Sequence, residues 1–77
     1  MGNFRQTIFA SDKGYIIGLL KVKKTDMESM KDYVNKLVTF TGYFHELIEN
    51  ENYYFQGEEA YHPKYGFQFN VKKYERV

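Results

Sequence analysis

The sequence contains no cysteine, no tryptophan and a single proline, and it has no long apolar run. The absence of cysteine excludes disulfide bridges and thiolate-rich zinc sites, and it is typical of a reducing compartment. No apolar stretch approaches the roughly 18–20 residues that span a bilayer, and residues 1–9 lack the apolar core of a secretory signal. We therefore expect a soluble cytoplasmic protein without a membrane partner.

Aromatic residues are abundant instead, with eight tyrosines and seven phenylalanines among 77 residues. Such rings suit the pleated, half-buried surface of a sheet better than a helix. A chain this short buries only about 60–65 % of its unfolded surface, so one small domain over residues 1–77 needs a core of large side chains. The formal net charge of +1 gives no overall attraction for a polyanion. Any contact with nucleic acid therefore has to come from a local arrangement of charges.

Alternation of apolar and polar residues predicts five strands, at residues 3–10, 14–24, 37–44, 53–61 and 67–76. Turn residues lie between the first two strands at 11–14 and between the last two at 62–66, so each pair is expected to form a hairpin. The inward rows are predicted to be Ile16, Leu20, Val22, Val38, Phe40, Tyr53, Phe55, Phe67, Phe69 and Val71.

Two glycines inside strands, Gly42 and Gly57, indicate bulges or sharp bends, which let a small sheet curl into a barrel. The pattern therefore predicts an all-β fold, a small five-stranded antiparallel barrel. An OB-fold is the first interpretation and an SH3-like barrel is the second. The usual OB helix between the third and fourth strands has no counterpart, because residues 46–52 are too few for more than one turn.

The segment between the second and third predicted strands has a weak helical pattern. Thr25 and Glu28 match a capping box, and Met27, Met30 and Val34 have helical spacing. One or two helical turns are predicted here. A solvated loop explains the same residues equally well, because isolated helices of this length are marginal in water.

Catalytic chemistry has little support in this sequence. The two histidines, His45 and His62, have no second metal-ligand residue two or four positions away. Glu58 and Glu59 are adjacent, so in a strand they point to opposite faces and do not form an acid–base pair. No glycine-rich phosphate loop is present. We therefore expect no catalytic residue, metal or cofactor in this chain.

The outward rows of the strands combine tyrosines, lysines and small polar residues such as Tyr15, Thr39, Thr41 and Gln68. This combination suits single-stranded nucleic acid, because bases stack on the rings and cations follow the phosphates. The candidate nucleic-acid-binding residues are Lys21, Lys23, Tyr43, Tyr54, Lys72 and Tyr74. A structural interpretation stays open, in which the tyrosines cover the barrel with their hydroxyls in water and the lysines keep the domain soluble.

Residues 51–57 (ENYYFQG) nearly reproduce the cleavage sequence of a plant-virus protease that is used in expression tags. A tag would lie at a terminus, whereas strand-like segments flank these residues on both sides. We therefore interpret them as part of the protein's own fold.

Three motifs follow one another in the second half of the chain: TGYFHEL at 41–47, YYFQGE at 53–58 and HPKYGFQF at 62–69. Together they resemble the N-terminal domain of bacterial RecD-like ATP-dependent DNA helicases (the RecD/TraA family, similar to the alpha subunit of exodeoxyribonuclease V). Residues 14–24 match this domain more loosely. His45 stands where the family often has proline, which affects only the entry to a loop.

The resemblance implies that residues 1–77 are an accessory, non-catalytic OB-like N-terminal domain of a larger helicase. Such a parent binds ATP and Mg²⁺ and unwinds DNA in the 5′ to 3′ direction, in recombination and repair. Motor domains of this kind do not fit into 77 residues, so the ATP-dependent activity belongs to the parent. The expected partners are single-stranded DNA and the motor domains. In the alternative, the domain is a structural or interaction module that packs against the helicase body or a partner protein.

Overall fold

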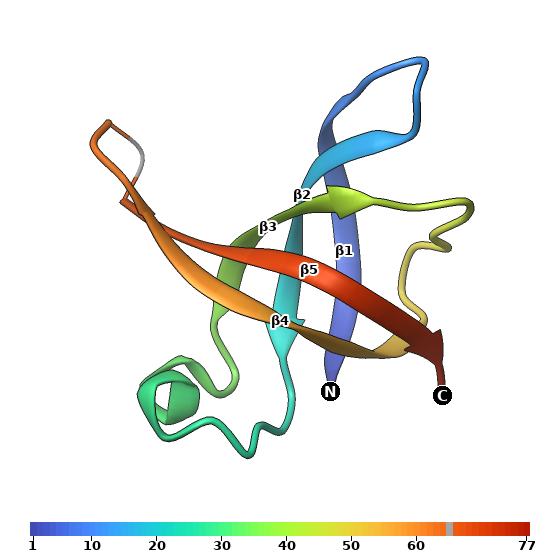
Figure 1. Cartoon of the computed structure of the whole chain (residues 1–77). Helices are drawn as coiled ribbons and strands as arrows, with labels where there is room; N and C mark the ends of the chain where they lie inside the picture. Colours follow the sequence, from blue (N-terminus) through green and yellow to red (C-terminus); the bar gives the residue numbers. More distant parts are fainter. Residues whose placement is uncertain (65) are drawn as a thin grey trace.

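The computed structural model describes residues 1–64 and 66–77, in which it has five strands and one short helix. The strands are β1 (Gly2–Ala10), β2 (Tyr15–Val22), β3 (Leu37–Tyr43), β4 (Asn52–His62) and β5 (Gly66–Arg76) (Figure 1). A 3-10 helix, η1 (Glu28–Tyr33), lies between β2 and β3. All five predicted strands are confirmed, with ends that differ by at most two residues. Of the turn expected at 62–66, Tyr65 lies outside the described residues.

The strands close into a barrel in the order β1–β2–β3–β5–β4. Four neighbouring pairs are antiparallel, whereas β3 and β5 run parallel, with Thr39 opposite Gln68. A closed ring with an odd number of strands cannot alternate in direction all the way round, so at least one neighbouring pair has to be parallel. The predicted five-stranded barrel is confirmed, and its fully antiparallel arrangement is corrected at this one pair.

The core is built around Phe40, whose side chain has no exposed surface. Its ring centroid lies 5.9 Å from that of Phe4, 5.5 Å from that of Phe44 and 5.7 Å from that of Phe55, so one ring connects opposite sides of the barrel. The buried apolar residues are Phe4, Leu20, Val22, Met30, Val38, Phe40, Phe44, Tyr53, Phe69 and Val71. The predicted inward rows contain most of these residues but omit Phe4, Met30 and Phe44.

The two strand glycines have different roles. At Gly57 the pairing of β4 with β5 shifts register, and a Cβ there would lie 1.9 Å from the carbonyl oxygen of Asn70. The predicted bulge is therefore confirmed at Gly57. β3 keeps its register with β2 through Gly42, where a Cβ would lie 3.0 Å from the carbonyl oxygen of Val71. Gly42 thus provides space for a neighbouring strand rather than a bulge.

The helix η1 covers one end of the barrel, where the ring of Tyr33 stacks on Phe67 with centroids 4.6 Å apart. The predicted helical turns are confirmed, but the capping box is wrong. A capping box needs Glu28 in the third helical position, whereas the helix begins at Glu28. The hydroxyl of Thr25 instead accepts a hydrogen bond from the Met27 N–H at 3.1 Å, before the helix starts.

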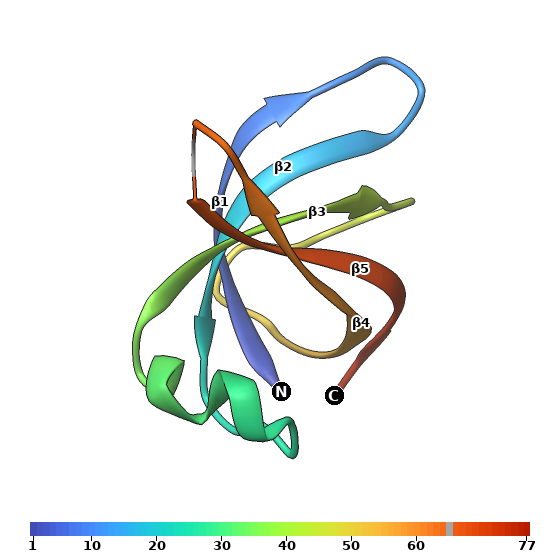
Figure 2. The same ribbon diagram turned by 60° about the vertical axis from the view of Figure 1, so that its left-hand side comes forward.

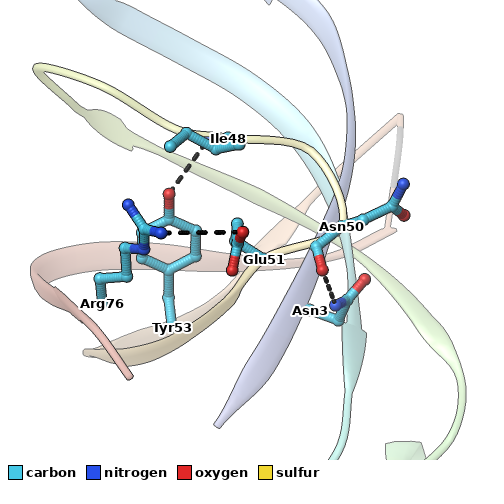
Figure 3. Close-up of polar contacts among 6 residues, drawn as sticks. All are labelled: Asn3, Ile48, Asn50, Glu51, Tyr53 and Arg76. Carbon is cyan, nitrogen blue, oxygen red and sulfur yellow. Dashed lines mark hydrogen bonds and ion pairs between the residues drawn. The ribbon is translucent and has the colours of Figure 1, made fainter.

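A loop at residues 44–51 connects β3 to β4 and is fastened to the barrel by buried polar groups. The hydroxyl of Tyr53 accepts a hydrogen bond from the Ile48 N–H at 2.9 Å, and Nδ2 of Asn3 donates to the Asn50 carbonyl at 2.8 Å (Figure 3). Glu51 and Arg76 add an ion pair at 3.7 Å. Residues 51–57 enter β4, and Tyr53 is in the core, so the tag-like segment is part of the fold.

The two hairpin turns lie at one end of the barrel. The connection from β1 to β2 and the connection from β4 to β5 point away from the end that carries η1 and both chain termini (Figures 1 and 2). None of the helical segments in the described part of the chain has the length and apolarity that crossing a lipid bilayer requires.

Candidate nucleic-acid interface

Strands β2, β3 and β5 present one continuous outward surface, which we call the outer face. Residues opposite each other in adjacent strands point to the same side of a sheet, so each cross-strand pair forms one step of this surface. The steps made by β2 and β3 are Tyr15–Tyr43, Ile17–Thr41, Leu19–Thr39 and Lys21–Leu37. β5 extends the two middle steps with Asn70 beside Thr41 and Gln68 beside Thr39.

One end of the outer face carries an exposed aromatic ring. Tyr15 and Tyr43 form an edge-to-face pair with centroids 5.2 Å apart, and Tyr43 is 70 % exposed. Lys72 follows two residues after Asn70 on β5 and is also exposed. Lys72 thus lies two residues beyond Asn70, the last residue of β5 that pairs with β3, toward the tyrosine end of the face.

Lys72 is also the extra residue of a bulge. Gln56 pairs with Lys73 and Gly57 pairs with Val71, so Lys72 has no counterpart on β4. Bulges re-aim a side chain and are common beside functional sites. The bulge thus takes the exposed Lys72 out of the regular pairing of β5 with β4.

The other end of the outer face carries two lysines. Lys21 is half-buried opposite Leu37, and Lys23 is exposed just after the end of β2, in the same alternating row. Leu37 and Tyr43 are six positions apart on β3, so the face is about 20 Å long at roughly 3.3 Å per residue.

The middle of the face is polar but closed. The hydroxyl of Thr41 donates a hydrogen bond to Oδ1 of Asn70 at 2.5 Å, and Thr41 is buried between its neighbours. Thr41 has the outward position predicted for it, but it is buried, because Asn70 of the adjacent parallel strand lies against it. The hydrogen bond ties β3 to β5 at the parallel pair.

Charge is unevenly distributed around the barrel. Strands β1, β2 and β3 contain Arg5 and Lys21 but no aspartate or glutamate. Carboxylates gather on β4 and on the loop before it, at Glu46, Glu49, Glu51, Glu58 and Glu59. A phosphate chain on the outer face thus meets no carboxylate from β1, β2 or β3, although the whole chain is almost neutral.

The remaining tyrosine candidates lie elsewhere. Tyr54 is exposed on β4, opposite Glu75 and not beside a lysine of the outer face. The ring of Tyr74 packs against Phe44 at 4.8 Å, and its hydroxyl accepts a hydrogen bond from the His45 N–H at 2.9 Å. The outward position predicted for Tyr74 is wrong, because the unmatched Lys72 reverses the alternation of β5.

Two residues of β1 that the sequence pattern did not identify, Phe9 and Arg5, adjoin the outer face. Phe9 pairs with Ile17 and so extends the Ile17–Thr41 step of the face onto β1. Phe9 is 52 % exposed. Arg5 is exposed beside a register shift. A second shift at Ile8 breaks the two-residue period, so the alternation assigned no rows to β1. The apolar neighbours Ile8 and Phe9 in one predicted strand were the available signal.

A pocket of about 500 Å³ opens at the end of the barrel near η1. Its floor includes Val22, Met30 and Phe69 from the core. Its rim carries Lys24, Asp26, Thr25, Gln56, Glu75 and Tyr54. Charges of both signs at this rim do not match a polyanion. The residues that line the pocket, Tyr54 among them, include none of the outer face, so the two surfaces are separate.

The histidines form no metal site in the described residues, since no three His, Asp or Glu side chains there lie close enough to hold an ion. Nδ1 of His62 accepts a hydrogen bond from the Lys64 N–H at 3.1 Å, which fits a turn role. His45 is exposed at the start of the loop before β4.

No solved structure matches the chain. The family model described as "ATP-dependent DNA helicase YrrC, OB-fold domain" matches residues 1–77. This match agrees with the five-stranded barrel and with its strand order. The chain therefore belongs to the family of OB-fold domains of the ATP-dependent DNA helicase YrrC.

Proposed function

We propose that this domain is an accessory, non-catalytic part of a DNA helicase and that it contacts single-stranded DNA through the outer face. OB-folds that bind oligonucleotides use the face of their second and third strands and the loops after the first and fourth strands. In this chain the corresponding strands, β2 and β3, carry the outer face. The family membership supports the assignment to a helicase. The side chains of the outer face support the contact with DNA.

A single arrangement carries the proposal: Tyr43 and the bulged Lys72 are both exposed toward the same end of the outer face, and the strands β2 and β3 of that face have no carboxylates. Tyr43 offers a ring for base stacking, which contributes about 1–3 kcal/mol per base. Lys72 is suited to the adjacent phosphate, and Lys21 and Lys23 are suited to phosphates about 20 Å further along the strand.

We infer that the remaining steps of the activity belong to the parent protein. ATP and Mg²⁺ bind to its motor domains, and this domain uses no cofactor of its own. The motif resemblance supports a RecD-like parent that acts in recombination and repair in the cytoplasm, moving 5′ to 3′. The domain then guides the single strand close to the motor.

A second candidate is favoured by the apolar residues of the same face. Ile17 and Leu19 are half-buried, and Leu37 is exposed, so aliphatic surface accompanies the tyrosines. The cores of protein interfaces are apolar and poor in charge. In this candidate function the outer face packs against the helicase body or a partner protein.

The test is a fluorescence titration of the domain into labelled oligothymidine at several salt concentrations. We expect Tyr43→Ala to weaken binding about 5- to 150-fold, the equivalent of one stacked base. Lys72→Ala should reduce the slope of log K against log salt by about 0.7, the value for one phosphate contact on a single strand.

Two matched variants serve as controls for this titration. Tyr54→Ala removes an exposed ring on β4, and Lys31→Ala removes an exposed lysine of η1 that is paired with Glu28 at 3.3 Å. Both should bind as the unmodified domain does. Absence of binding at low salt, or equal losses in all four variants, would reject the DNA contact. If deleting the domain then lowered the melting temperature of the parent helicase without changing its DNA affinity, the packing candidate would replace it.

A further inference from the structure

The second register shift of β1 determines which side of the sheet carries Phe9. Thr7 pairs with Gly18, and the next pair is Phe9 with Ile17, so Ile8 is left unmatched. In a regular strand Ile8 would lie opposite Ile17, and Phe9 would point to the inner side of the barrel. The bulge instead places Phe9 in the outward row, where it is half-exposed.

Phe9 and Tyr43 are thus two exposed rings on one face. Phe9 shares its cross-strand step with Ile17 and Thr41, and Tyr43 lies two residues beyond Thr41 on β3. Two strand spacings across and two residues along place the Cα atoms of Phe9 and Tyr43 about 12 Å apart. Bases stacked in a duplex are about 3.4 Å apart along each strand. The two rings therefore fit separate bases of a strand that is extended and unstacked.

The turn at residues 11–14 fixes the end of the sheet that carries these rings. The hydroxyl of Ser11 accepts a hydrogen bond from the Tyr15 N–H at 3.1 Å, and the Ser11 N–H donates to the Tyr15 carbonyl at 2.9 Å. The Gly14 carbonyl accepts a hydrogen bond from the Phe44 N–H at 3.0 Å, which ties the turn to the end of β3. Backbone hydrogen bonds thus connect β1, β2 and β3 at this end, so a ligand has little to order when it binds.

We propose that Phe9 is a second base-stacking platform, so that the single strand passes from Tyr43 across β2 onto β1. This inference rests on the proposed DNA contact and extends it. The route along β2 and β3 toward Leu37 offers only aliphatic and hydroxyl side chains between its ends, whereas the route across the sheet reaches a second ring. β1 and β2 contribute no carboxylate to this route, and the turn beside it carries Asp12 and Lys13, one charge of each sign.

Phe9→Trp tests the contact directly. The chain has no tryptophan, so this variant carries a single indole, whose fluorescence is quenched when a base stacks on it. Oligothymidine should quench this fluorescence, and the variant should bind at least as tightly as the unmodified domain, because an indole also stacks on bases. Tyr61→Trp is the control, since it places the indole at a 72 % exposed position on β4, and its fluorescence should not change.

Affinity measurements separate stacking from apolar contact. Phe9→Ala should weaken binding to oligothymidine about 5- to 150-fold, the equivalent of one stacked base. Phe9→Leu keeps an apolar side chain without a ring and should lose affinity as well. Ile8→Ala removes apolar surface from the 56 % exposed neighbour and should bind normally. The losses of Phe9→Ala and Tyr43→Ala should add in the double variant, because sites more than about 7–10 Å apart act independently.

The outcomes distinguish this inference from the DNA contact on which it rests. If Tyr43→Ala weakens binding while Phe9→Ala does not, the DNA contact stands and the route onto β1 is wrong. Unchanged fluorescence of the Phe9→Trp variant at saturating oligothymidine would overturn the route in the same way. Equal losses in Phe9→Ala and Ile8→Ala would assign the effect to apolar surface and reject stacking. Absence of binding in every variant and in the unmodified domain would overturn both proposals.

Discussion

The β1–β2–β3 sheet and the β4–β5 hairpin differ in how their outward surfaces meet water. The three-stranded sheet exposes Phe9, Leu37 and Tyr43 and has no carboxylate in its strands, whereas the hairpin carries charges of both signs, with Glu58 and Glu59 on β4 and Lys72, Lys73, Glu75 and Arg76 on β5. Mixed charge is the usual surface of a domain that faces only solvent. The sheet lacks it, so we expect the partners of this domain to bind on the side of β1, β2 and β3.

The two regions share one core, and the largest effect should come from breaking it. Phe40→Ala removes the ring that contacts Phe4 on one side and Phe55 on the other. Such truncations of buried phenylalanine destabilise by about 3–5 kcal/mol, a large part of the stability of a small domain. We expect loss of the cooperative thermal transition, measured by circular dichroism. A sharp transition near the original temperature would mean that the two regions have separate cores.

The hairpin should be sensitive at its bulge. Gly57→Ala places a Cβ 1.9 Å from a backbone oxygen of β5, so the strands have to separate locally. We expect a loss of about 1–3 kcal/mol, as for other overpacked sites, in a urea titration. Gly66→Ala is the control, because its φ of 79° disfavours alanine while no atom lies within 4 Å of the new Cβ. That variant should lose about 1–2 kcal/mol from backbone strain alone. Equal DNA affinity in both folded variants would show that the bulge serves stability and not the position of Lys72.

The sequence pattern was sufficient for the strands and the barrel. Alternating residues and turn signals marked each strand, because a half-buried strand needs one apolar side. The parallel β3–β5 pair has no local signal in Thr39 or Gln68. The parallel pair follows instead from the closure of five strands into a ring. The residue pattern within single strands does not show which strands become neighbours when the ring closes.

The site could be predicted only in part, because alternation distinguishes inside from outside but not one side of a closed barrel from another. Lys21, Tyr43 and Lys72 share the outer face because their strands are neighbours in the ring, with Lys21 at one end and Tyr43 and Lys72 toward the other. Tyr54 has the same outward pattern but lies on another side. Tyr74 was misplaced because the unmatched Lys72 reverses the period of β5. Gly57 marked the bulge on β4, but nothing in the sequence shows which residue of the partner strand it leaves unmatched.

The junction between the two regions should show a smaller effect. Tyr53→Phe removes the hydroxyl that accepts the Ile48 N–H and leaves that backbone group without its partner. We expect a loss of about 1 kcal/mol in the urea titration, the usual value for one hydrogen bond. Arg76→Ala removes the half-exposed ion pair with Glu51 and should lose less than about 0.5 kcal/mol. The reverse order would mean that charge, and not the buried hydroxyl, fastens the loop at 44–51.

The smallest effect should come from one carboxylate on the outer face. Thr39→Glu adds a negative charge between Leu19 and Gln68, in the middle of the side that lacks acids. If DNA lies there, affinity for oligothymidine should fall about two- to fivefold at low salt and recover as salt shortens the Debye length toward about 8 Å. Gln56→Glu adds the same charge to β4 and should have less effect, because that region already carries carboxylates. Equal losses in both variants would mean that DNA responds only to net charge, and the difference between the two regions would then have no role in binding.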